Sequence, residues 1–309
     1  MSFGSSIPCP VCLKADFERA FEAVQHSFER CRGCGFTRMA DPPSRDGLCG
    51  FYSEDRLSGE AAWQEHERNL VRFDGYLQWI ERRARAGRFL DVGCSIGTSL
   101  LAAKRRGWSV LGLELSRPAA EFGSRSFGVE IRTETIDSAE LEPGSFDAVW
   151  MHHTIEHVER PERVLERARD LLVGGGLLFQ ALPNHDSLKG RLLGPFFGYG
   201  VTVEHLSHFG RKTFTAMLRR LGFEIVAVRT RSYREDPRLL WDLACRLGKQ
   251  DWLARRAGLQ DASRMDQEAW IAFLSRSRTA RFLSNRVWPA RICGWLGLGE
   301  DLHVLARKA

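Results

Sequence analysis

The sequence contains no long apolar run. None of its apolar stretches approaches the roughly 20 residues that a transmembrane helix needs, so no membrane-spanning segment is predicted. The amino terminus also lacks a basic segment followed by an apolar one, which is the pattern of a secretory signal. From these two absences we expect a cytoplasmic protein.

The chain also has only a modest excess of charge. Its formal net charge is +6 over 309 residues, and 43% of the residues are hydrophobic, which is enough for one large core with small attachments. The charge is unevenly distributed, because residues 230–309 hold 15 Lys and Arg against 9 Asp and Glu. This segment accounts for the whole positive excess.

The most informative segment is a glycine-spaced turn at residues 89–98. An apolar strand runs into Asp91, and Gly93 and Gly97 follow before a helix that begins near Thr98. Glycines allow a tight backbone path and close approach of a ligand, and a helix amino terminus offers free amide donors. An ordinary strand-to-helix loop is the simpler alternative, but a second strand at 108–113 ends in Glu114, a carboxylate placed to bind two ribose hydroxyls.

A nicotinamide-binding Rossmann domain fits this segment less well. A G-x-G-x-x-G motif that begins at Gly93 needs glycines where the chain has Ser95 and Thr98. The pattern therefore favours another nucleotide cofactor.

Four segments together resemble the class I S-adenosylmethionine-dependent methyltransferases. They are F-L-D-V-G-C-S-I-G at 89–97, the acid at Glu114, F-D-A-V-W at 146–150 and L-L-V-G-G-G-L-L-F at 171–179, within a resemblance that covers about 90–230. The resemblance implies S-adenosylmethionine as cofactor and an α/β fold with a seven-stranded, doubly wound, Rossmann-like sheet. It implies these cofactor-binding residues: Asp91, Gly93, Cys94, Gly97, Glu114, Leu115, Thr135, Ile136, Asp137 and His153. Ser95 replaces the middle glycine of the family and is small enough to fit the turn.

Strands and helices alternate from Phe89 onward, as a parallel sheet covered on both faces requires. Strands are predicted near 88–92, 108–113, 129–132, 146–151, 176–181, 223–230 and 302–307. A long helix is predicted from about Gly59 to Ala86, with one apolar face. In the resembling family such a helix packs over the cofactor cleft, so Tyr52, Trp63 and His66 are candidates for the cavity wall, with Tyr52 as a substrate-binding residue.

Four of the eight cysteines have the spacing of a metal site. Cys9 and Cys12 form one C-x-x-C pair, and Cys31 and Cys34 form a second after an 18-residue separation. Each pair can place two thiolates on one tetrahedral ion through a tight knuckle turn, so a structural Zn²⁺ ion in an amino-terminal zinc ribbon is predicted. Disulfides are the alternative. The other four cysteines, Cys49, Cys94, Cys245 and Cys293, are expected to be small buried hydrophobic residues.

Three domains follow from these patterns. Residues 1–48 form the zinc ribbon, residues 49–235 and 299–309 form the cofactor-binding domain, and residues 236–298 form a helical insertion. The insertion holds five tryptophans and has five arginines but no acid between Glu268 and Glu300. It is interpreted as a helical lid, or as a surface for peripheral membrane contact or another phosphate-rich partner.

The segment after the fourth strand holds three histidines and a glutamate within six residues, at 152–157. Glu156 and His157 resemble the E-H pair of small-molecule methyltransferases, including the ubiquinone-pathway O-methyltransferases. His157 is the predicted general base, with His153 and His205 as alternatives, and Glu156 is a predicted substrate-binding residue. A structural role for His157, or a second divalent ion at His153, Glu156 and His157, remains open.

A second polar cluster at 203–214 resembles the H-L-x-H-F stretch of the same family. His205 and His208 are predicted substrate-binding residues, and on a helical turn they share a face. One of the two can instead simply cap the helix that follows, and His205 is preferred as the cavity residue.

The predicted function is O-methylation of a small-molecule acceptor: a sugar, a glycolipid or a specialised metabolite. The alternative is a ribosomal-RNA methyltransferase, since an amino-terminal zinc ribbon before this fold also resembles the ribosomal-RNA guanine methyltransferases. The E-H pair and the H-L-x-H-F stretch favour the small-molecule acceptor. A non-enzymatic scaffold is disfavoured because Asp91, Gly93, Gly97 and Glu114 are all present.

Overall fold

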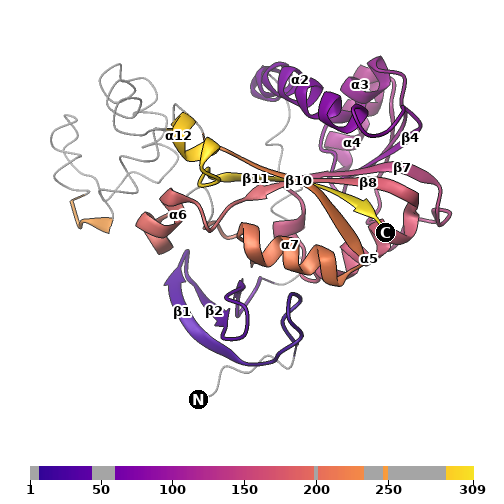
Figure 1. Ribbon diagram of the computed structural model, residues 1–309. Helices are drawn as coiled ribbons and strands as arrows, with labels where there is room; N and C mark the ends of the chain where they lie inside the picture. Colours follow the sequence, from indigo (N-terminus) through magenta and orange to yellow (C-terminus); the bar gives the residue numbers. More distant parts are fainter. Residues whose placement is uncertain (1–6, 44–59, 198–200, 233–245, 250–289) are drawn as a thin grey trace.

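The computed structural model describes residues 7–43, 60–197, 201–232, 246–249 and 290–309. One central sheet runs through the molecule, with helices on both faces and a small second sheet below it (Figure 1). The predicted insertion at 236–298 falls mostly outside the described residues; its described end contains the short helix α12 (Ala290–Trp295).

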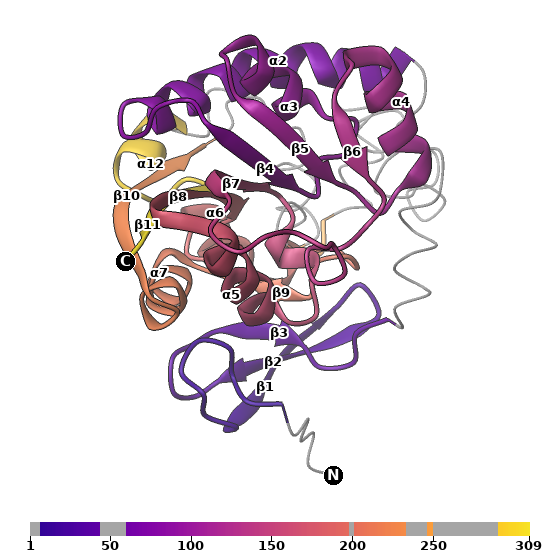
Figure 2. The ribbon, with the colours of Figure 1, turned by 90° about the vertical axis from the view of Figure 1, so that its right-hand side faces the viewer.

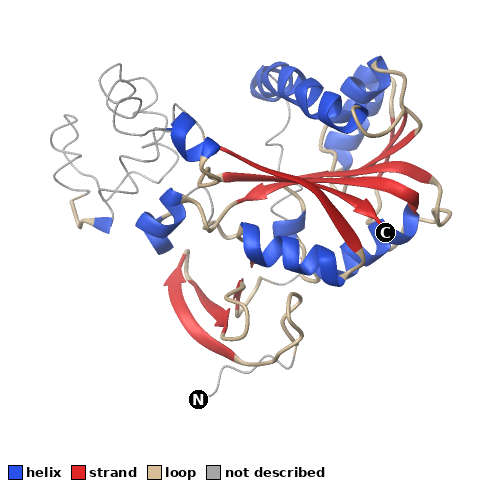
Figure 3. Cartoon of the chain, in the orientation of Figure 1, coloured by secondary structure: helices blue, strands red, loops and turns tan. Residues whose placement is uncertain are grey.

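The central sheet has seven strands, as the sequence predicts (Figure 3). Their spatial order is β10 (Phe223–Arg231), β11 (Asp301–Lys308), β8 (Leu172–Pro183), β7 (Phe146–His152), β4 (Arg88–Val92), β5 (Ser109–Leu113) and β6 (Glu130–Arg132). The predicted strand positions match within two residues, except that β8 begins four residues earlier. The α/β prediction is confirmed.

One strand departs from the predicted parallel arrangement. β11 is antiparallel to both of its neighbours, β10 and β8. The reason is that the segment between β10 and β11 leaves and returns at the same end of the two strands. Thr230 at the end of β10 donates to the carbonyl of Gly294 (3.1 Å) and accepts from the amide of Gly299 (3.1 Å). The chain therefore re-enters the sheet from the end at which it left.

Helices form one layer on each face of the sheet (Figures 1 and 2). One layer contains α2 (Glu60–Glu81), α3 (Thr98–Arg105) and α4 (Arg117–Phe127), and the other contains α5 (Pro161–Leu171) and α7 (Arg211–Arg220). The predicted long helix is confirmed in α2, although it ends five residues earlier than expected. No helix in the described part of the chain is long and apolar enough to cross a bilayer.

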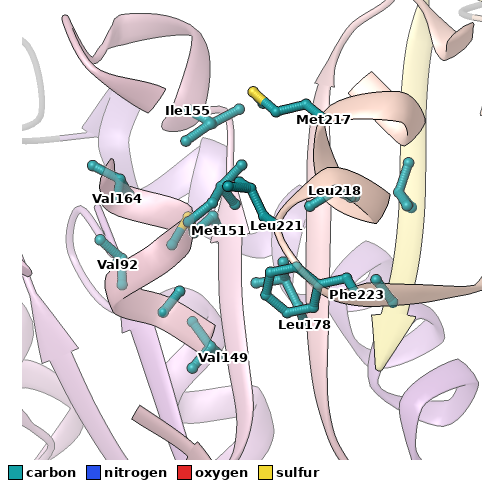
Figure 4. Packing of buried hydrophobic residues seen from close by; sticks show 14 of the residues in the cluster. Val92, Val149, Met151, Ile155, Val164, Leu178, Met217, Leu218, Leu221 and Phe223 are labelled. Carbon is teal, nitrogen blue, oxygen red and sulfur yellow. The ribbon is translucent and has the colours of Figure 1, made fainter. Parts of the chain in front are cut away.

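Successive side chains of β7 pack into two separate apolar cores, one on each face of the sheet. Val149 and Met151 point to the α5 and α7 side, where they pack with Leu178 and Met217 (Figure 4). Trp150 points to the opposite side and stacks on Phe179. Successive strand residues face opposite sides of a sheet, so a continuous apolar strand is what a sheet covered on both faces requires. Complete burial of each such side chain contributes about 1.5–3 kcal/mol.

The amino-terminal residues form a second, four-stranded sheet. It contains β1 (Phe17–Ala23), β2 (His26–Cys31), β3 (Thr37–Met39) and, from the larger domain, β9 (Ser207–His208). β1 and β2 form a short antiparallel hairpin between the two cysteine pairs. The fourth strand was not predicted, and it joins the amino-terminal segment to the domain that carries the cofactor turn.

Two helical glycines give a matched test of this packing. A Cβ atom at Gly123 in α4 would lie 2.3 Å from the carbonyl oxygen of Ile96 in the glycine turn, whereas one at Gly75 in α2 meets nothing within 4 Å. We expect Gly123→Ala to lower the free energy of unfolding by about 1–3 kcal/mol through overpacking. Gly75→Ala should raise it by about 1 kcal/mol, because alanine favours a helix more than glycine does.

Urea titrations followed by circular dichroism measure both changes. Shifts of the same sign in the two variants would contradict the packing of α4 on the turn.

Candidate functional site

A cavity of about 1250 Å³ opens where β4, β5 and β7 end. Ligands in parallel sheets collect at the carboxyl ends of strands, so this is the expected position. Of the residues predicted to bind cofactor, nine line the cavity: Asp91, Gly93, Cys94, Glu114, Leu115, Thr135, Ile136, Asp137 and His153. The tenth, Gly97, lies just behind the wall at the start of α3, with a φ of +78°.

The glycine turn has the tight path that its sequence predicts. Gly93 has a φ of +75°, and a Cβ atom there would lie 2.6 Å from the hydroxyl oxygen of Thr154. Ser95, which stands in place of a family glycine, also adopts a left-handed conformation, with a φ of +50°. A non-glycine residue in this region costs about 1–3 kcal/mol. The turn therefore carries strain at the point that faces the cavity.

Glu114 holds the turn and the next helix together at the rim of the cavity. Its carboxylate accepts hydrogen bonds from the backbone amides of Ser95 (2.8 Å) and Ser116 (2.8 Å). Two carboxylate oxygens have about four lone-pair positions in all, so acceptor capacity remains after these two bonds. A fixed carboxylate with free acceptor capacity fits the ribose hydroxyls of a nucleoside.

Asp91 lies at the floor of the cavity and is buried. Its Oδ2 accepts a hydrogen bond from the hydroxyl of Ser99, whereas its Oδ1 has no hydrogen-bond partner among the described residues. Burial, together with the nearby charge of Glu114, raises the pKa of Asp91 to about 8, despite the hydrogen bond from Ser99. A cationic ligand group would favour its ionised form, so Asp91 fits the positively charged methionine part of S-adenosylmethionine.

His153 is held between two buried carboxylates. Its Nδ1 lies 3.0 Å from Oε1 of Glu156, and its Nε2 lies 3.3 Å from Oδ1 of Asp301. Burial alone would lower the pKa of His153, but Asp301 and Glu156 outweigh it and raise the pKa to about 10. His153 is therefore an imidazolium at neutral pH, with no ring lone pair that can take a proton from the hydroxyl group of a substrate.

The contribution of β11 to this site was not predicted. Asp301 also lies 2.9 Å from Nε2 of His303, which in turn lies 3.1 Å from the hydroxyl oxygen of Tyr76 in α2. Asp301 and His303 are two residues apart in β11, among the apolar residues Leu302, Val304, Leu305 and Ala306, so their side chains share a face of the sheet. That alternation was the available signal, but nothing local pairs residue 301 with residue 153.

His157 has a ring nitrogen suited to accept a proton. It lies in η1 (Ile155–His157) and lines the cavity. Its Nδ1 lies 3.0 Å from the carbonyl oxygen of Glu204, and since a carbonyl only accepts, this nitrogen carries the proton. The lone pair is then on Nε2, which lies 4.0 Å from Oε1 of Glu156.

His205 and His208 do not share a helical face. β9 (Ser207–His208) is extended, and His205 lies before it, directly after a turn, so no helical turn carries both histidines. The His205 ring lies 4.8 Å from that of His157, whereas the buried His208 packs 4.9 Å from the ring of Phe28 in β2. Neither histidine lines the cavity, and Glu156 lies behind its wall as well. His205 is the one close to the predicted base.

The other wall candidates have mixed outcomes. His66 in α2 lines the cavity, bonds to the Thr98 hydroxyl (2.8 Å) and stacks on Phe127. Tyr52 lies outside the described residues, as does the side chain of Trp63.

The four cysteines of the two C-x-x-C pairs come together. All four sulfur atoms lie within 4.8 Å of one another, with Cys9 and Cys34 separated by 3.5 Å and Cys12 and Cys31 by 3.4 Å. Zinc–sulfur bonds of about 2.3 Å place the sulfurs of a tetrahedral site about 3.8 Å apart, so the arrangement fits Zn²⁺. Outside the pairs, Cys94 and Cys293 are buried as predicted, and Cys49 and Cys245 lie outside the described residues.

Among the described residues, one other cluster has metal-ligand geometry. Glu156, His157 and His205 each offer a ligand atom within 4.8 Å of the others. This set differs from the predicted set, because His153 is replaced by His205. The position of His153 between two carboxylates gives the physical reason.

Comparison with known proteins identifies the family. A family model described as a methyltransferase domain matches residues 63–228, more than half of the chain. The chain belongs to this methyltransferase family. With the cofactor turn and the sheet order, it is a class I S-adenosylmethionine-dependent methyltransferase, as predicted.

Curated relatives match part of the chain. The ubiquinone biosynthesis O-methyltransferase of Paraburkholderia phymatum is 34% identical over 129 residues, which are 39% of this chain and 54% of the relative. The protein of the same name from Ralstonia nicotianae is 38% identical over 122 residues, 37% of this chain and 50% of the relative. The chain spans about half the length of the curated relatives it matches.

A solved structure confirms the fold. A methyltransferase from Archaeoglobus fulgidus, described as dependent on S-adenosylmethionine, superposes with a TM-score of 0.51 and 19% identity. The match covers 84% of this chain and 99% of that one.

The pKa of Asp91 predicts pH-dependent cofactor binding. Only the ionised carboxylate attracts a cationic ligand group, and with a pKa of about 8 the ionised fraction rises from about 1% at pH 6 to about half at pH 8. The affinity for S-adenosylhomocysteine, which keeps the ammonium group, should therefore increase from pH 6 to pH 8 and level off above. Binding should release protons at pH 7.

Calorimetry in buffers of different ionisation enthalpy measures both effects. Asp91→Asn should bind more weakly at pH 8 and lose the pH dependence. A wild-type affinity that is constant from pH 6 to pH 8.5 contradicts the assignment.

Proposed function

We propose that the protein methylates a hydroxyl group of a small molecule: a sugar, a glycolipid or a specialised metabolite. The observation that carries this proposal is the orientation of His157 in the cavity wall, where the contact of Nδ1 with the carbonyl of Glu204 assigns the proton to Nδ1 and the lone pair to Nε2. Pockets for one small molecule typically occupy about 300–1,000 Å³, so a cavity of about 1250 Å³ has room for a cofactor and a small acceptor. The names of the curated relatives support transfer to oxygen.

In this proposal, bound S-adenosylmethionine supplies a methyl group on a sulfonium. Asp91 and Glu114 bind the cofactor, and the cavity wall holds the acceptor hydroxyl in line with the methyl group. His157 removes the hydroxyl proton at Nε2. The carboxylate of Glu156, 4.0 Å away, stabilises the imidazolium that forms. His153 serves as a positioning residue, since each of its two ring nitrogens faces a carboxylate.

The alternatives have defined places in this arrangement. His205 is 4.8 Å, ring to ring, from His157 and is the second candidate for the base. His208 packs under β2 and is the weaker candidate for a substrate contact. Methylation of ribosomal RNA remains the second candidate function, and an assay with both classes of acceptor separates the two.

We expect His157→Ala to lower turnover by about 100-fold or more, because a general base typically contributes 10²–10⁴-fold. Its affinity for S-adenosylhomocysteine should stay within twofold, since Asp91 and Glu114, which bind the cofactor in this proposal, lie at the ends of β4 and β5 and not in η1. Turnover is measured as release of S-adenosylhomocysteine with a catechol, a nucleotide-linked sugar or a ribosomal RNA fragment as acceptor.

His205→Ala is the matched control, since it removes a neighbouring imidazole but leaves the tautomer of His157 intact. Near-normal turnover in His157→Ala with loss in His205→Ala would move the base to His205. If the RNA fragment is methylated and neither small molecule is, the RNA proposal replaces the small-molecule one.

We further propose that Cys9, Cys12, Cys31 and Cys34 bind one structural Zn²⁺ ion. Two matching knuckles support it: the amide of Leu13 donates to the carbonyl of Cys9 (2.9 Å), and the amide of Gly35 donates to that of Cys31 (2.8 Å). A sheet of this size builds little core, so metal binding contributes to its folding.

Elemental analysis of protein purified without added metal should find one zinc per chain. Cys31→Ser should lose most of it, because three thiolates leave the tetrahedral site open. Cys293→Ser, which alters a buried cysteine far from the cluster in sequence, should keep it. Equal metal content in the two variants would contradict the assignment.

A further inference from the structure

The amino-terminal sheet is completed by a strand of the methyltransferase domain. β3 pairs antiparallel with β9, with Thr37 opposite His208 and Arg38 opposite Ser207. The amide of Met39 donates to the carbonyl of Leu206 (2.9 Å), and Leu206 lines the cavity. A backbone hydrogen-bond ladder therefore connects the small sheet to a residue of the cavity wall.

The chain leaves β3 directly into the cavity wall. Pro42 and Pro43 line the cavity, only three and four residues after Met39. Asp41 fixes this exit, because its Oδ1 accepts a hydrogen bond from the amide of Ser27 (2.9 Å). Its carbonyl also lies 3.0 Å from Nδ1 of His26. Proline restricts the backbone further, so the segment from Asp41 to Pro43 is short and stiff.

The same strand that anchors Asp41 ends in the cysteine cluster. β2 begins at His26 and Ser27 and ends at Cys31. A metal ion bound by the cysteines would thus fix one end of β2, and the other end fixes Asp41. The single short strand β2 therefore connects the cysteine cluster to the segment that enters the cavity wall.

Buried packing prevents the small sheet from moving independently. Phe36, beside the second cysteine pair, lies 4.9 Å from the ring of Phe209, the residue after β9. The cysteines belong to the same apolar cluster as Phe214 of α7. The small sheet and the larger domain therefore share one core.

The cofactor half of the cavity is held by other contacts. Its hydrogen bonds run between β4, β5 and the glycine turn, as from the amide of Gly93 to the carbonyl of Leu113 (2.8 Å). The bonds of Glu114 to Ser95 and Ser116 also remain within this half. None of these bonds involves a residue of the small sheet.

We propose that the amino-terminal sheet is the acceptor-side wall of the cavity, with Asp41 as the positioning residue for Pro42 and Pro43. It acts on acceptor binding and leaves cofactor binding unchanged. That this half of the cavity binds the acceptor rests on the proposed methyl transfer. Only the expected effect of metal removal rests on the proposed zinc. A zinc ribbon that served an unrelated partner would not place its own residues in the catalytic cavity.

The test compares Asp41→Ala with Glu18→Ala. Both remove a carboxylate from the small sheet, but Glu18 pairs with Arg32 on the exposed side. Hydrogen–deuterium exchange of residues 39–41 and 205–209 should be at least fivefold faster in Asp41→Ala than in Glu18→Ala. Exchange at 93–97 and the affinity for S-adenosylhomocysteine should be unchanged within twofold in both variants.

With the catechol acceptor, KM should rise at least fivefold in Asp41→Ala while kcat changes less than twofold. Exchange and KM equal to those of Glu18→Ala would overturn the proposal, as would an equal loss of cofactor affinity. The hydrogen–deuterium exchange measurement needs neither turnover nor metal. It therefore tests whether Asp41 holds this wall of the cavity even if the proposed acceptor class or the proposed zinc is wrong. Removal of zinc by a chelator should reproduce the exchange pattern of Asp41→Ala if the ribbon holds the metal.

Discussion

The site depends on one buried interaction, the imidazolium of His153 between the carboxylates of Asp301 and Glu156. Charges in a protein interior need partners, because their desolvation is otherwise too costly. Here the three partners come from the end of β7, from η1 and from the start of β11. The fold must therefore bring β11 beside β8 with its amino terminus at the cofactor edge, and the antiparallel direction of β11 does this. His153 also has a φ of +53°, so its backbone is strained where its side chain is fixed.

The carboxylates on either side of His153 separate two roles that the sequence analysis assigned to one cluster. His153 and His157 are four residues apart and contact the same carboxylate, but both ring nitrogens of His153 face carboxylates, whereas Nδ1 of His157 donates to a carbonyl. The difference arises from the second partner: a carboxylate for His153 and a backbone carbonyl for His157. Identical side chains thus acquire different chemistry from contacts that are distant in sequence.

Local patterns predicted most of the fold, and the structure confirms them where the pattern is itself local. The glycine turn at 93–97, the C-x-x-C pairs and the apolar strands depend on neighbouring residues, so their spacing is readable in the sequence. The direction of β11, the pairing of Asp301 with His153 and the addition of β9 to the small sheet depend on contacts between segments up to about 170 residues apart. No periodicity specifies such contacts. The expectation for His205 and His208 assumed a helical turn, and the pairing of β9 with β3 produces an extended segment instead.

The closed junction between β10 and β11 has a consequence for how such a chain can change over evolutionary time. Thr230 bonds to both Gly294 and Gly299, and the hydroxyl of Ser232 bonds to the buried Glu300, so the two ends of the intervening segment are fastened to each other. The pairing of β10 with β11 depends on these hydrogen bonds and not on the number of residues in the segment between them. Loop-closure entropy grows slowly with length, by about 0.6 kcal/mol for each doubling. The position is therefore one at which a segment can be lengthened, shortened or exchanged while the catalytic scaffold keeps its shape.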